Sequence, residues 1–415
     1  MATELLFYEY PTVEECTAEV LSCTEKDGKY LITLTKTPIF PEGGGQLADG
    51  GMIVGPGGNE ARITDCRTED GEIVHYTDAA FPPGARVRVC LDAEKRLDRS
   101  EQHTGEHILS GLAAKLFGAK NVGFHMSEEY CTIDLDIPLE REQTEALELA
   151  ANAAVRADLT VHTEITDGDD ASSRPLRKRA EKVQGEVRIV YIDNGKIDSC
   201  TCCGTHLNTT GMVGAIRITD HQHYKGGTRL FFVCGGRAAR LGIEEHGALT
   251  ELARRYSTSR RDLPAAIKKQ AEEVQDLKSE LKLKSALIAR TEARELIDHA
   301  KLSGKTRVMF KVYQNFGAND LKLILDETAA AMETAPCEWA ALIFSSGASG
   351  TDYRMGSSGG CKLSMRDLCA AVNAATGGKG GGSPVFAQGR SEKPLDKETA
   401  DTIENYLIKA TQQGF

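Results

Sequence analysis

The spacing of hydrophobic residues divides this chain into a strand-rich start, a mixed middle, a helical stretch and a mixed end. Over residues 1–92, four short segments alternate apolar with polar residues or run apolar, and glycine and proline stand between them. This pattern is typical of short strands joined by tight turns, and it predicts a small β-barrel domain. The predicted strands are Lys29–Thr35, Glu60–Cys66, Glu72–Thr77 and Arg86–Leu91.

Residues 93–240 change character and mix helical with strand periodicity. Helices are predicted over Arg96–Phe117 and over residues 139–157, where apolar residues recur at helical spacing. A second domain with an α+β pattern follows from this mixture. Its predicted strands are Cys131–Ile137, Val187–Asp193, Gly214–Thr219 and Arg229–Cys234.

Residues 241–303 are predicted to be a helical, coiled-coil linker. From Leu263 onward, a seam of positions follows at alternating steps of four and three residues, which is the spacing of a coiled coil. The seam predicts a homodimer, with an intramolecular helical hairpin as the alternative. Its members after Leu263 are Ile267, Gln270, Val274, Leu277, Leu281, Lys284 and Ile288.

Residues 304–415 alternate strand and helix again and predict a C-terminal α/β domain. Strands are expected at Arg307–Tyr313 and Ala340–Phe344, and helices over Met365–Thr376 and from Lys397. The glycine-rich run at residues 377–382 does not match the G-x-x-x-x-G-K-[ST] phosphate loop, so we interpret it as a flexible turn. The fold class predicted for the whole chain is α+β.

Composition narrows the functional classes. The 415 residues hold 50 Lys and Arg against 61 Asp and Glu, a net charge of −11, which argues against indiscriminate nucleic-acid binding but leaves room for a local basic patch. No apolar run approaches the ~18 residues of a membrane span, and the start lacks a signal-peptide pattern. We therefore expect a cytoplasmic protein whose 12 cysteines are reduced, so that clustered cysteines are candidate metal ligands.

Two short motifs predict one zinc site. His103 and His107 are four residues apart within a predicted helix, so both imidazoles lie on one helix face. Cys202 and His206 follow a predicted strand at C-x-x-x-H spacing. Three imidazoles and a thiolate form a ligand set that tetrahedral zinc prefers.

Two ambiguities remain in this prediction. Cys200 and Cys203 are alternative thiolate ligands, and they also suit small buried side chains. The helix motif also reads H-x-x-E-H, which in inverzincin peptidases uses the glutamate, here Glu106, as general base. Such a peptidase needs a downstream acidic ligand rather than a Cys/His pair.

Several blocks of the sequence resemble alanyl-tRNA editing domains. Phe40–Gly51 is similar to their glycine-rich signature, His103–His107 to their H-x-x-x-H, and Asp198–Gly211 to their C-G-G-T-H segment. The resemblance continues through Arg229–Ala239, and Gly377–Gly389 is similar to the DHH-associated C-terminal domain of alanyl-tRNA synthetase. The chain thus resembles the long class of free-standing AlaX editing proteins over nearly its whole length.

This resemblance implies an aminoacyl-tRNA deacylase that hydrolyses mischarged seryl-tRNA(Ala), with glycyl-tRNA(Ala) as a second candidate substrate. It implies that residues 93–240 form a zinc-containing editing domain, with the metal ligands His103, His107, Cys202 and His206. The partner implied is the acceptor end of tRNA(Ala), with contacts to its elbow from residues 304–415. One departure is Cys203, which stands where the family has glycine.

Further residues are candidates for substrate contacts. Gln46 and Thr104 are the catalytic candidates, because an amide and a hydroxyl suit an ester or a serine side chain; the alternatives are a loop cap and a helix-backbone contact. The candidates for substrate binding are Gly44, Gly45 and Asp49 in the glycine-rich block, His125, and Arg177 and Arg179 in a basic stretch.

Two other functions compete with the deacylase. One is a tRNA(Ala)-binding module with a structural zinc, since closed four-ligand sites are usually structural. The other is the inverzincin-like zinc peptidase.

Overall fold

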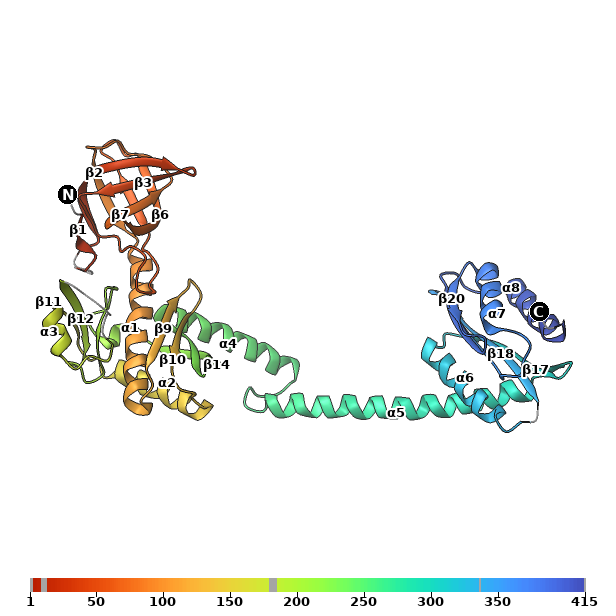
Figure 1. Cartoon of the computed structure of the whole chain (residues 1–415). Coiled ribbons are helices and arrows are strands. Elements are labelled where there is room, and N and C mark those ends of the chain that lie inside the picture. The colour runs from red at the N-terminus through yellow and green to blue at the C-terminus, as the bar shows by residue number, and fades with distance from the viewer. Residues whose placement is uncertain (1–2, 9–12, 179–184, 336, 414–415) are drawn as a thin grey trace. The chain divides into compact units, whose positions relative to one another are not determined.

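The computed structural model describes residues 3–8, 13–178, 185–335 and 337–413 (Figure 1). The chain divides into two compact units, an N-terminal unit of residues 1–252 and a C-terminal unit of residues 253–415. In the described ranges, no helix is both long and apolar enough to cross a membrane.

A closed six-stranded barrel opens the N-terminal unit, as the strand pattern predicted. Apolar residues that alternate along the strands fill its interior; Ile32, Ile53 and Val89 are fully buried there. Two of its strands, β2 (Glu15–Lys26) and β5 (Gly51–Val54), were not predicted from the sequence. The strand order around the barrel is β2 (Glu15–Lys26), β3 (Lys29–Leu34), β7 (Glu72–Thr77), β6 (Glu60–Glu69), β5 (Gly51–Val54) and β8 (Arg86–Leu91). A short parallel pair beside the barrel joins β1 (Glu4–Leu5) to β4 (Lys36–Thr37).

Helix α1 (Ala93–Phe117) leads from the barrel into the second domain and carries the two histidines. Asp92 begins it, because its side chain accepts a hydrogen bond from the Lys95 amide at 3.1 Å. Gly118 ends it in the left-handed conformation at φ 70°. All residues from Gln102 to Ala113 are buried, although several of them are polar. Buried polar residues need partners, so this stretch marks a candidate site.

Helix α1 packs against two antiparallel sheets of the N-terminal unit, which lie on either side of it in Figure 1. It contacts β13 of one sheet and β9, β10 and β15 of the other. The four-stranded sheet has the order β14 (Ile216–Tyr224), β15 (Gly227–Cys234), β10 (Cys131–Leu135), β9 (Asn121–Met126). The three-stranded sheet has the order β11 (Val161–Asp167), β12 (Glu186–Ile192), β13 (Asp198–Thr201). The helices α2 (Arg141–Arg156) and α3 (Gly168–Ser173) complete this region.

The stretch expected to be one helical linker is two helices, α4 (Gly235–Arg255) and α5 (Leu263–Asp298). Pro264 lies in the first turn of α5, where its missing N–H breaks no helical hydrogen bond. The predicted end at residue 303 is wrong, because β16 (Lys301–Ser303) pairs with the C-terminal sheet. The predicted seam of α5 carries exposed apolar side chains, including Leu277 at 63% and Leu281 at 65% exposure.

The C-terminal unit is built on one mixed six-stranded sheet. Its strand order is β16, β17 (Thr306–Gln314), β18 (Glu338–Gly347), β19 (Gly350–Ser357), β21 (Phe386–Ser391), β20 (Lys379–Gly382). The pair β17–β18 is parallel and the other pairs are antiparallel. The glycine run interpreted as a flexible turn is largely the edge strand β20. The helices are α6 (Ala318–Met332), α7 (Met365–Thr376) and α8 (Lys397–Gln413).

Candidate metal centre and its pocket

Four side chains from two distant stretches of the sequence meet beside α1. His103, His107, Cys202 and His206 each offer one ligand atom, and these atoms all lie within 4.8 Å of one another. The Cys202 Sγ atom is 3.4 Å from Nε2 of His103 and 3.5 Å from Nε2 of His206. Zinc bonds of about 2.3 Å to sulfur and 2.0–2.1 Å to nitrogen put tetrahedral ligands about 3.5 Å apart. The donor set therefore fits zinc in chemistry and in spacing.

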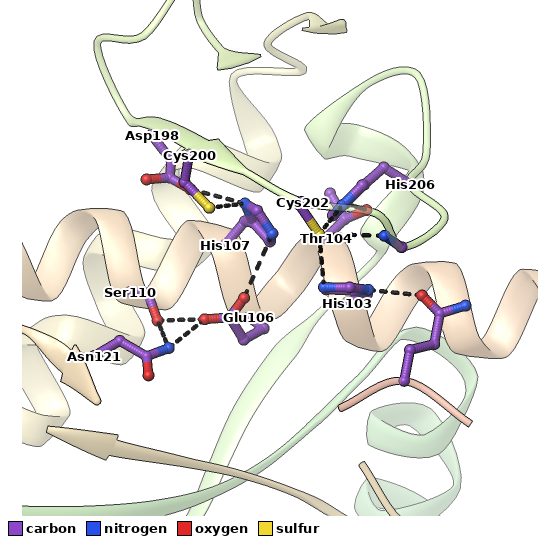
Figure 2. Close-up of polar contacts among 12 residues, drawn as sticks. His103, Thr104, Glu106, His107, Ser110, Asn121, Asp198, Cys200, Cys202 and His206 are labelled. Carbon is purple, nitrogen blue, oxygen red and sulfur yellow. Dashed lines mark hydrogen bonds and ion pairs between the residues drawn. The ribbon is translucent and has the colours of Figure 1, made fainter. Parts of the chain in front are cut away.

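Each imidazole of this cluster has a polar partner on its outer nitrogen, Nδ1 (Figure 2). A partner of this kind fixes the tautomer and the ring orientation and keeps the other nitrogen available for a metal. The partners are Gln46 for His103 at 2.7 Å, Asp198 for His107 at 2.8 Å and Thr104 for His206 at 3.3 Å.

Burial and neighbouring groups favour the metal-binding forms of Cys202 and His206. For His107, burial lowers the pKa, but Cys200, Glu106 and Asp198 outweigh burial and raise it well above its usual value. Burial alone raises the pKa of Cys202, but the charge of His103 and hydrogen bonds from the three histidines outweigh burial, so this pKa lies well below its usual value. Burial lowers the pKa of His206 well below its usual value, and the neighbouring His107 and His103 lower it further. A thiolate and a neutral imidazole are the forms that bind a metal.

Gln46 lies behind the cluster rather than in front of it, which differs from its predicted role as a substrate contact. It is fully buried. Its Oε1 accepts hydrogen bonds from His103 and from the Thr205 amide, and its Nε2 donates to the Thr205 hydroxyl. Because both ends of the amide are engaged, Gln46 positions His103 and the loop that carries His206.

Thr104 is likewise fully buried and does not line the pocket. Its hydroxyl accepts a hydrogen bond from the Leu207 amide at 3.1 Å and contacts Nδ1 of His206. Thr104 therefore contacts the loop after β13, where the sequence predicted a contact with the substrate. The alternative of a bond to its own helix is not observed either.

The extra cysteines flank the cluster without joining it. Cys203 is exposed, and its backbone carbonyl accepts a hydrogen bond from Tyr8 at 2.8 Å. Cys200 is buried with its Sγ 3.9 Å from Nδ1 of His107, the nitrogen that also contacts Asp198. The four-residue cluster thus contains Cys202 as its thiolate, whereas Cys200 belongs to a second group with His107 and Asp198.

Gly204 explains why the departure at Cys203 is tolerated. A Cβ atom on Gly204 would lie 2.1 Å from Cε1 of His103 and 2.7 Å from Oε1 of Gln46, so glycine is required there. Cys203 does not contact the cluster in this way; it is exposed and lines the pocket near Gly44. Of the two glycine positions in the family motif, this chain keeps the one that touches the cluster.

The glycine-rich block contributes one edge of the pocket. Gly44 lines it, at φ +60°. Gly45 packs against β9: a Cβ atom there would lie 2.7 Å from the Phe124 carbonyl oxygen, and its own carbonyl accepts from the Met126 amide at 3.0 Å. Both glycines thus set how closely this loop approaches the metal centre.

Two predicted binding residues lie elsewhere. Asp49 is buried, and its carboxylate is held by the Phe40 amide at 2.8 Å and by the Arg96 guanidinium, so it joins the barrel to α1. His125 is exposed on β9 and does not line the pocket, because side chains alternate along a strand and Phe124 takes the inward position. Asp49 thus has a structural contact in place of the predicted one, whereas a substrate contact of His125 outside the pocket stays a prediction.

Arg177 does line the pocket, but it binds another side chain of the site. Its guanidinium donates to both oxygens of Asp198, at 2.5 and 3.0 Å, and Asp198 in turn accepts from His107. Arg177 thereby holds the carboxylate that orients His107. Arg179 lies outside the described residues.

A pocket of about 390 Å³ opens beside the cluster, and His103, His107 and Cys202 form part of its wall. Several of its residues were not predicted from the sequence, among them Asn121 and Phe124, whose ring stacks on that of His103 with centroids 5.2 Å apart. Glu106, considered only as a peptidase base, also lines it. Its Oε1 accepts from Ser110 at 2.5 Å and from Asn121 at 2.6 Å, and its Oε2 lies 3.6 Å from Nε2 of His107 (Figure 2).

Asp198 was also missed, although the sequence carried a signal for it. Asp198, Cys200 and Cys202 alternate at a spacing of two, so they share one face of β13 and of the residue after it. That face is turned toward α1, where all three approach the histidines.

Residues 187–231 match the family described as "Threonyl and Alanyl tRNA synthetase second additional domain". The match includes Cys202 and His206. Alanyl-tRNA editing protein Aarsd1 of Rattus norvegicus is 30% identical over 272 residues, 61% of this chain and 64% of that protein. Alanyl-tRNA editing protein AlaX-L of Pyrococcus horikoshii is 32% identical over 240 residues, 57% of this chain and 59% of that protein.

This chain is a relative of the alanyl-tRNA editing proteins. The resemblance predicted from its motifs is thereby confirmed. The chain spans about three fifths of the length of these curated relatives. Alanine–tRNA ligase of Methanospirillum hungatei is 30% identical over 401 residues, which are 93% of this chain and 41% of that ligase. The similarity to alanyl-tRNA synthetase thus extends past the metal centre into the C-terminal unit.

One solved structure, the C-Ala domain from Aquifex aeolicus alanyl-tRNA synthetase, matches at 18% identity with a TM-score of 0.23. The match covers 26% of this chain and 97% of that domain. A TM-score this low assigns no fold.

Proposed function

We propose that this chain is an aminoacyl-tRNA deacylase that hydrolyses the ester of mischarged tRNA(Ala) in trans. The observation that carries this proposal is the meeting of His103, His107, Cys202 and His206 in one cluster, of which His103, His107 and Cys202 line one pocket. Relatives that carry the name alanyl-tRNA editing protein supply the reaction class.

Seryl-tRNA(Ala) is the proposed main substrate, and glycyl-tRNA(Ala) the second. A synthetase pocket for alanine discriminates only weakly against an amino acid that lacks one methyl group or adds one hydroxyl, so a second site must remove the errors. An editing pocket that hydrogen-bonds the serine hydroxyl would leave its own polar groups unpaired with alanine. That penalty spares correctly charged alanyl-tRNA(Ala).

The four-residue cluster is proposed to hold one zinc ion. When bound, zinc in such a site polarises an ester oxygen or promotes ionisation of a water molecule. The chain's own residues supply the orientation: Gln46 and Asp198 each hold one imidazole by its outer nitrogen, and Arg177 in turn holds Asp198.

Glu106 is proposed to orient the attacking water. Its Oε1 is fixed by Ser110 and Asn121, so the carboxylate cannot turn away, and it lines the pocket next to His107. A carboxylate held in this way accepts a hydrogen bond from a water molecule in a fixed place. Phe124 covers the other side of His103 with an apolar ring, which limits access of further water.

The tRNA acceptor end is proposed to enter this pocket, with the C-terminal unit contacting the elbow of the same tRNA. A hollow of about 410 Å³ on the sheet of that unit is lined by Arg354, Lys379 and Arg390, of which Arg390 pairs with Asp352 in the same lining, and by Gly380 and Gly381 of the edge strand. Side chains of this charge beside bare backbone suit phosphate groups.

A tRNA(Ala)-binding module with a structural zinc is the second candidate. It is favoured by the closed set of four protein ligands, since catalytic zinc usually keeps an open position. The peptidase has no comparable support, because the downstream residues that join His103 and His107 are a cysteine and a histidine. The nearby Asp198 contacts the outer nitrogen of His107 and the guanidinium of Arg177.

Hydrolysis of seryl-, glycyl- and alanyl-tRNA(Ala) by the full chain separates these functions. We expect the wild type to release serine, glycine more slowly and alanine least, and His103→Ala/His107→Ala to lose both zinc and activity. The matched control is His221→Ala/His223→Ala, which removes two histidines of β14 outside the cluster. Tight tRNA binding without hydrolysis of any ester would instead establish the binding module. Peptide cleavage that Glu106→Gln abolishes would establish the peptidase.

A further inference from the structure

A second hollow of about 710 Å³ lies next to the pocket of the metal centre. The two share Asn121, Arg177 and Lys178 as lining residues, so they are adjacent. The second hollow is bordered by four lysines, and we name it the lysine groove. These are Lys115, Lys120, Lys178 and Lys196.

The lysines come from separate segments that the fold brings to one place. Lys115 lies in the last turn of α1 and Lys120 just before β9, whereas Lys178 and Lys196 come from the stretches on either side of β12. The four lysines are not consecutive in the sequence, so no single segment predicts this patch. A helical or strand periodicity therefore does not account for the gathering of these charges.

The positive charge of the lysine groove is largely uncompensated. All four lysines are exposed. Among the described residues, no carboxylate forms an ion pair with three of them, and Lys196 makes only a surface pair with Asp193 at 3.3 Å. The one carboxylate that lines the groove, Asp198, is buried and already bound to Arg177 and His107. In a chain with a net charge of −11, this concentration of positive charge is local.

We propose that the lysine groove binds the phosphodiester backbone of the single-stranded 3′ end of the tRNA, immediately upstream of the nucleotide whose ester lies in the pocket. This inference rests on the proposed function. An ester held beside His103 obliges the preceding phosphates to lie along a surface adjacent to the pocket, and the groove is such a surface. Lysine is a flexible point charge that suits phosphates of a mobile single strand, and the exposed Val122 offers an apolar surface to a base.

The test is a double-mutant cycle on binding. Wild type and Lys115→Ala/Lys120→Ala are titrated with uncharged tRNA(Ala) transcript and with the same transcript lacking its single-stranded 3′ end. The matched control is Lys26→Ala/Lys29→Ala, two exposed lysines that pair across the β2–β3 hairpin. We expect Lys115→Ala/Lys120→Ala to weaken binding of the intact transcript and to leave binding of the transcript without the 3′ end unchanged. With the intact transcript, the slope of log K against log salt is expected to fall by about 1.4, at about 0.7 per lost phosphate contact.

Each outcome is decisive. Loss of affinity that is the same with and without the 3′ end would overturn the proposal, because the lysines would then contact another part of the tRNA. Unchanged affinity and an unchanged salt slope would overturn it as well. Failure of the wild type to bind or deacylate any tRNA would instead overturn the proposed function. In deacylation of seryl-tRNA(Ala), the variant should raise KM and leave kcat unchanged, since the lysines lie outside the metal centre.

Discussion

The side chain of Gln46 accepts a hydrogen bond from Nδ1 of His103 at 2.7 Å, although 57 residues separate the two. The contact joins the glycine-rich loop of the barrel domain to α1. It makes Nδ1 the protonated nitrogen of this ring and leaves Nε2, which lies 3.4 Å from the Cys202 sulfur, as the nitrogen for a metal. The barrel domain therefore helps to build the metal centre rather than merely preceding it.

Replacement of Gln46 tests this relationship. We expect Gln46→Ala to weaken zinc affinity about 10- to 100-fold, because His103 loses the acceptor that fixes its tautomer. Competition with a zinc-binding dye measures the change. Gln275→Ala is the matched control, since Gln275 is exposed on α5. Equal zinc affinity in the two variants would show that His103 needs no support from the loop.

The requirement for glycine at residue 204 gives a second prediction. Gly204→Ala places a methyl group against His103 and Gln46 in a packed site, and we expect it to cost about 1–3 kcal/mol and to lower zinc content. Cys203→Ala is the neighbouring control and is expected to keep zinc, because Cys203 is exposed and lies outside the four-residue cluster. Metal content measured by mass spectrometry and unfolding by urea compare the two. Loss of zinc from Cys203→Ala would make Cys203 a ligand after all.

A buried histidine in the barrel predicts a pH dependence of stability. Burial lowers the pKa of His75 to about 4, and its ring contacts the Thr37 hydroxyl at 2.8 Å and the Ile32 carbonyl at 3.1 Å. Between that pKa and the unfolded value of about 6.5, only the unfolded chain binds the proton, so stability falls as the pH falls. The loss from this group is about 2 kcal/mol between pH 7 and pH 5.

Hydrogen exchange in β3 and β7 at the two pH values measures this loss. We expect the stability of His75→Gln to depend less on pH than that of the wild type. The stability of His223→Gln, a change at an exposed site, should depend on pH as the wild type's does. Identical pH sensitivity in all three proteins would show that His75 does not couple protonation to folding of the barrel.

The exposed seam of α5 predicts self-association, as the coiled-coil spacing did. Leu277 and Leu281 are 63% and 65% exposed, and burying them against the same helix of a second copy would remove both from water. We expect light scattering at micromolar concentration to give a dimer for the wild type and a monomer for Leu277→Glu/Leu281→Glu. Leu149→Glu, at an exposed position of α2, is the control. A monomeric wild type would contradict this prediction.

The local sequence predicted those elements whose two ends are marked by capping or turn residues. Helix α1 was found within three residues of its N-terminus, and its capping residues Asp92 and Gly118 explain why. Strand β9 was missed because Asn121–Met126 contains glycine and little apolar periodicity; its pairing with β10 imposes the strand conformation. With β9, the roles of Phe124 and Asn121 in the pocket were missed too.

The ligand cluster was predictable, but the residues that orient it were not. His103 and His107 are spaced to share one helix face, and Cys202 and His206 lie in one loop. These spacings identify the four candidate zinc ligands from the sequence. The contact of Gln46 with His103 depends instead on how the barrel packs on α1, which no local pattern encodes. For this reason the sequence suggested Gln46 and Thr104 as substrate contacts, whereas the fold turns both toward the imidazoles.

Zinc-edge X-ray absorption on the purified full chain tests the central claim most directly. We expect one zinc per chain, with one sulfur neighbour at about 2.3 Å and three nitrogen neighbours at about 2.0–2.1 Å. Cys202→Ser should remove the sulfur signal, and Cys200→Ser should leave it unchanged. Two sulfur neighbours, or a chain that binds no zinc when zinc is supplied, would contradict the claim that these three histidines and this cysteine form the metal site.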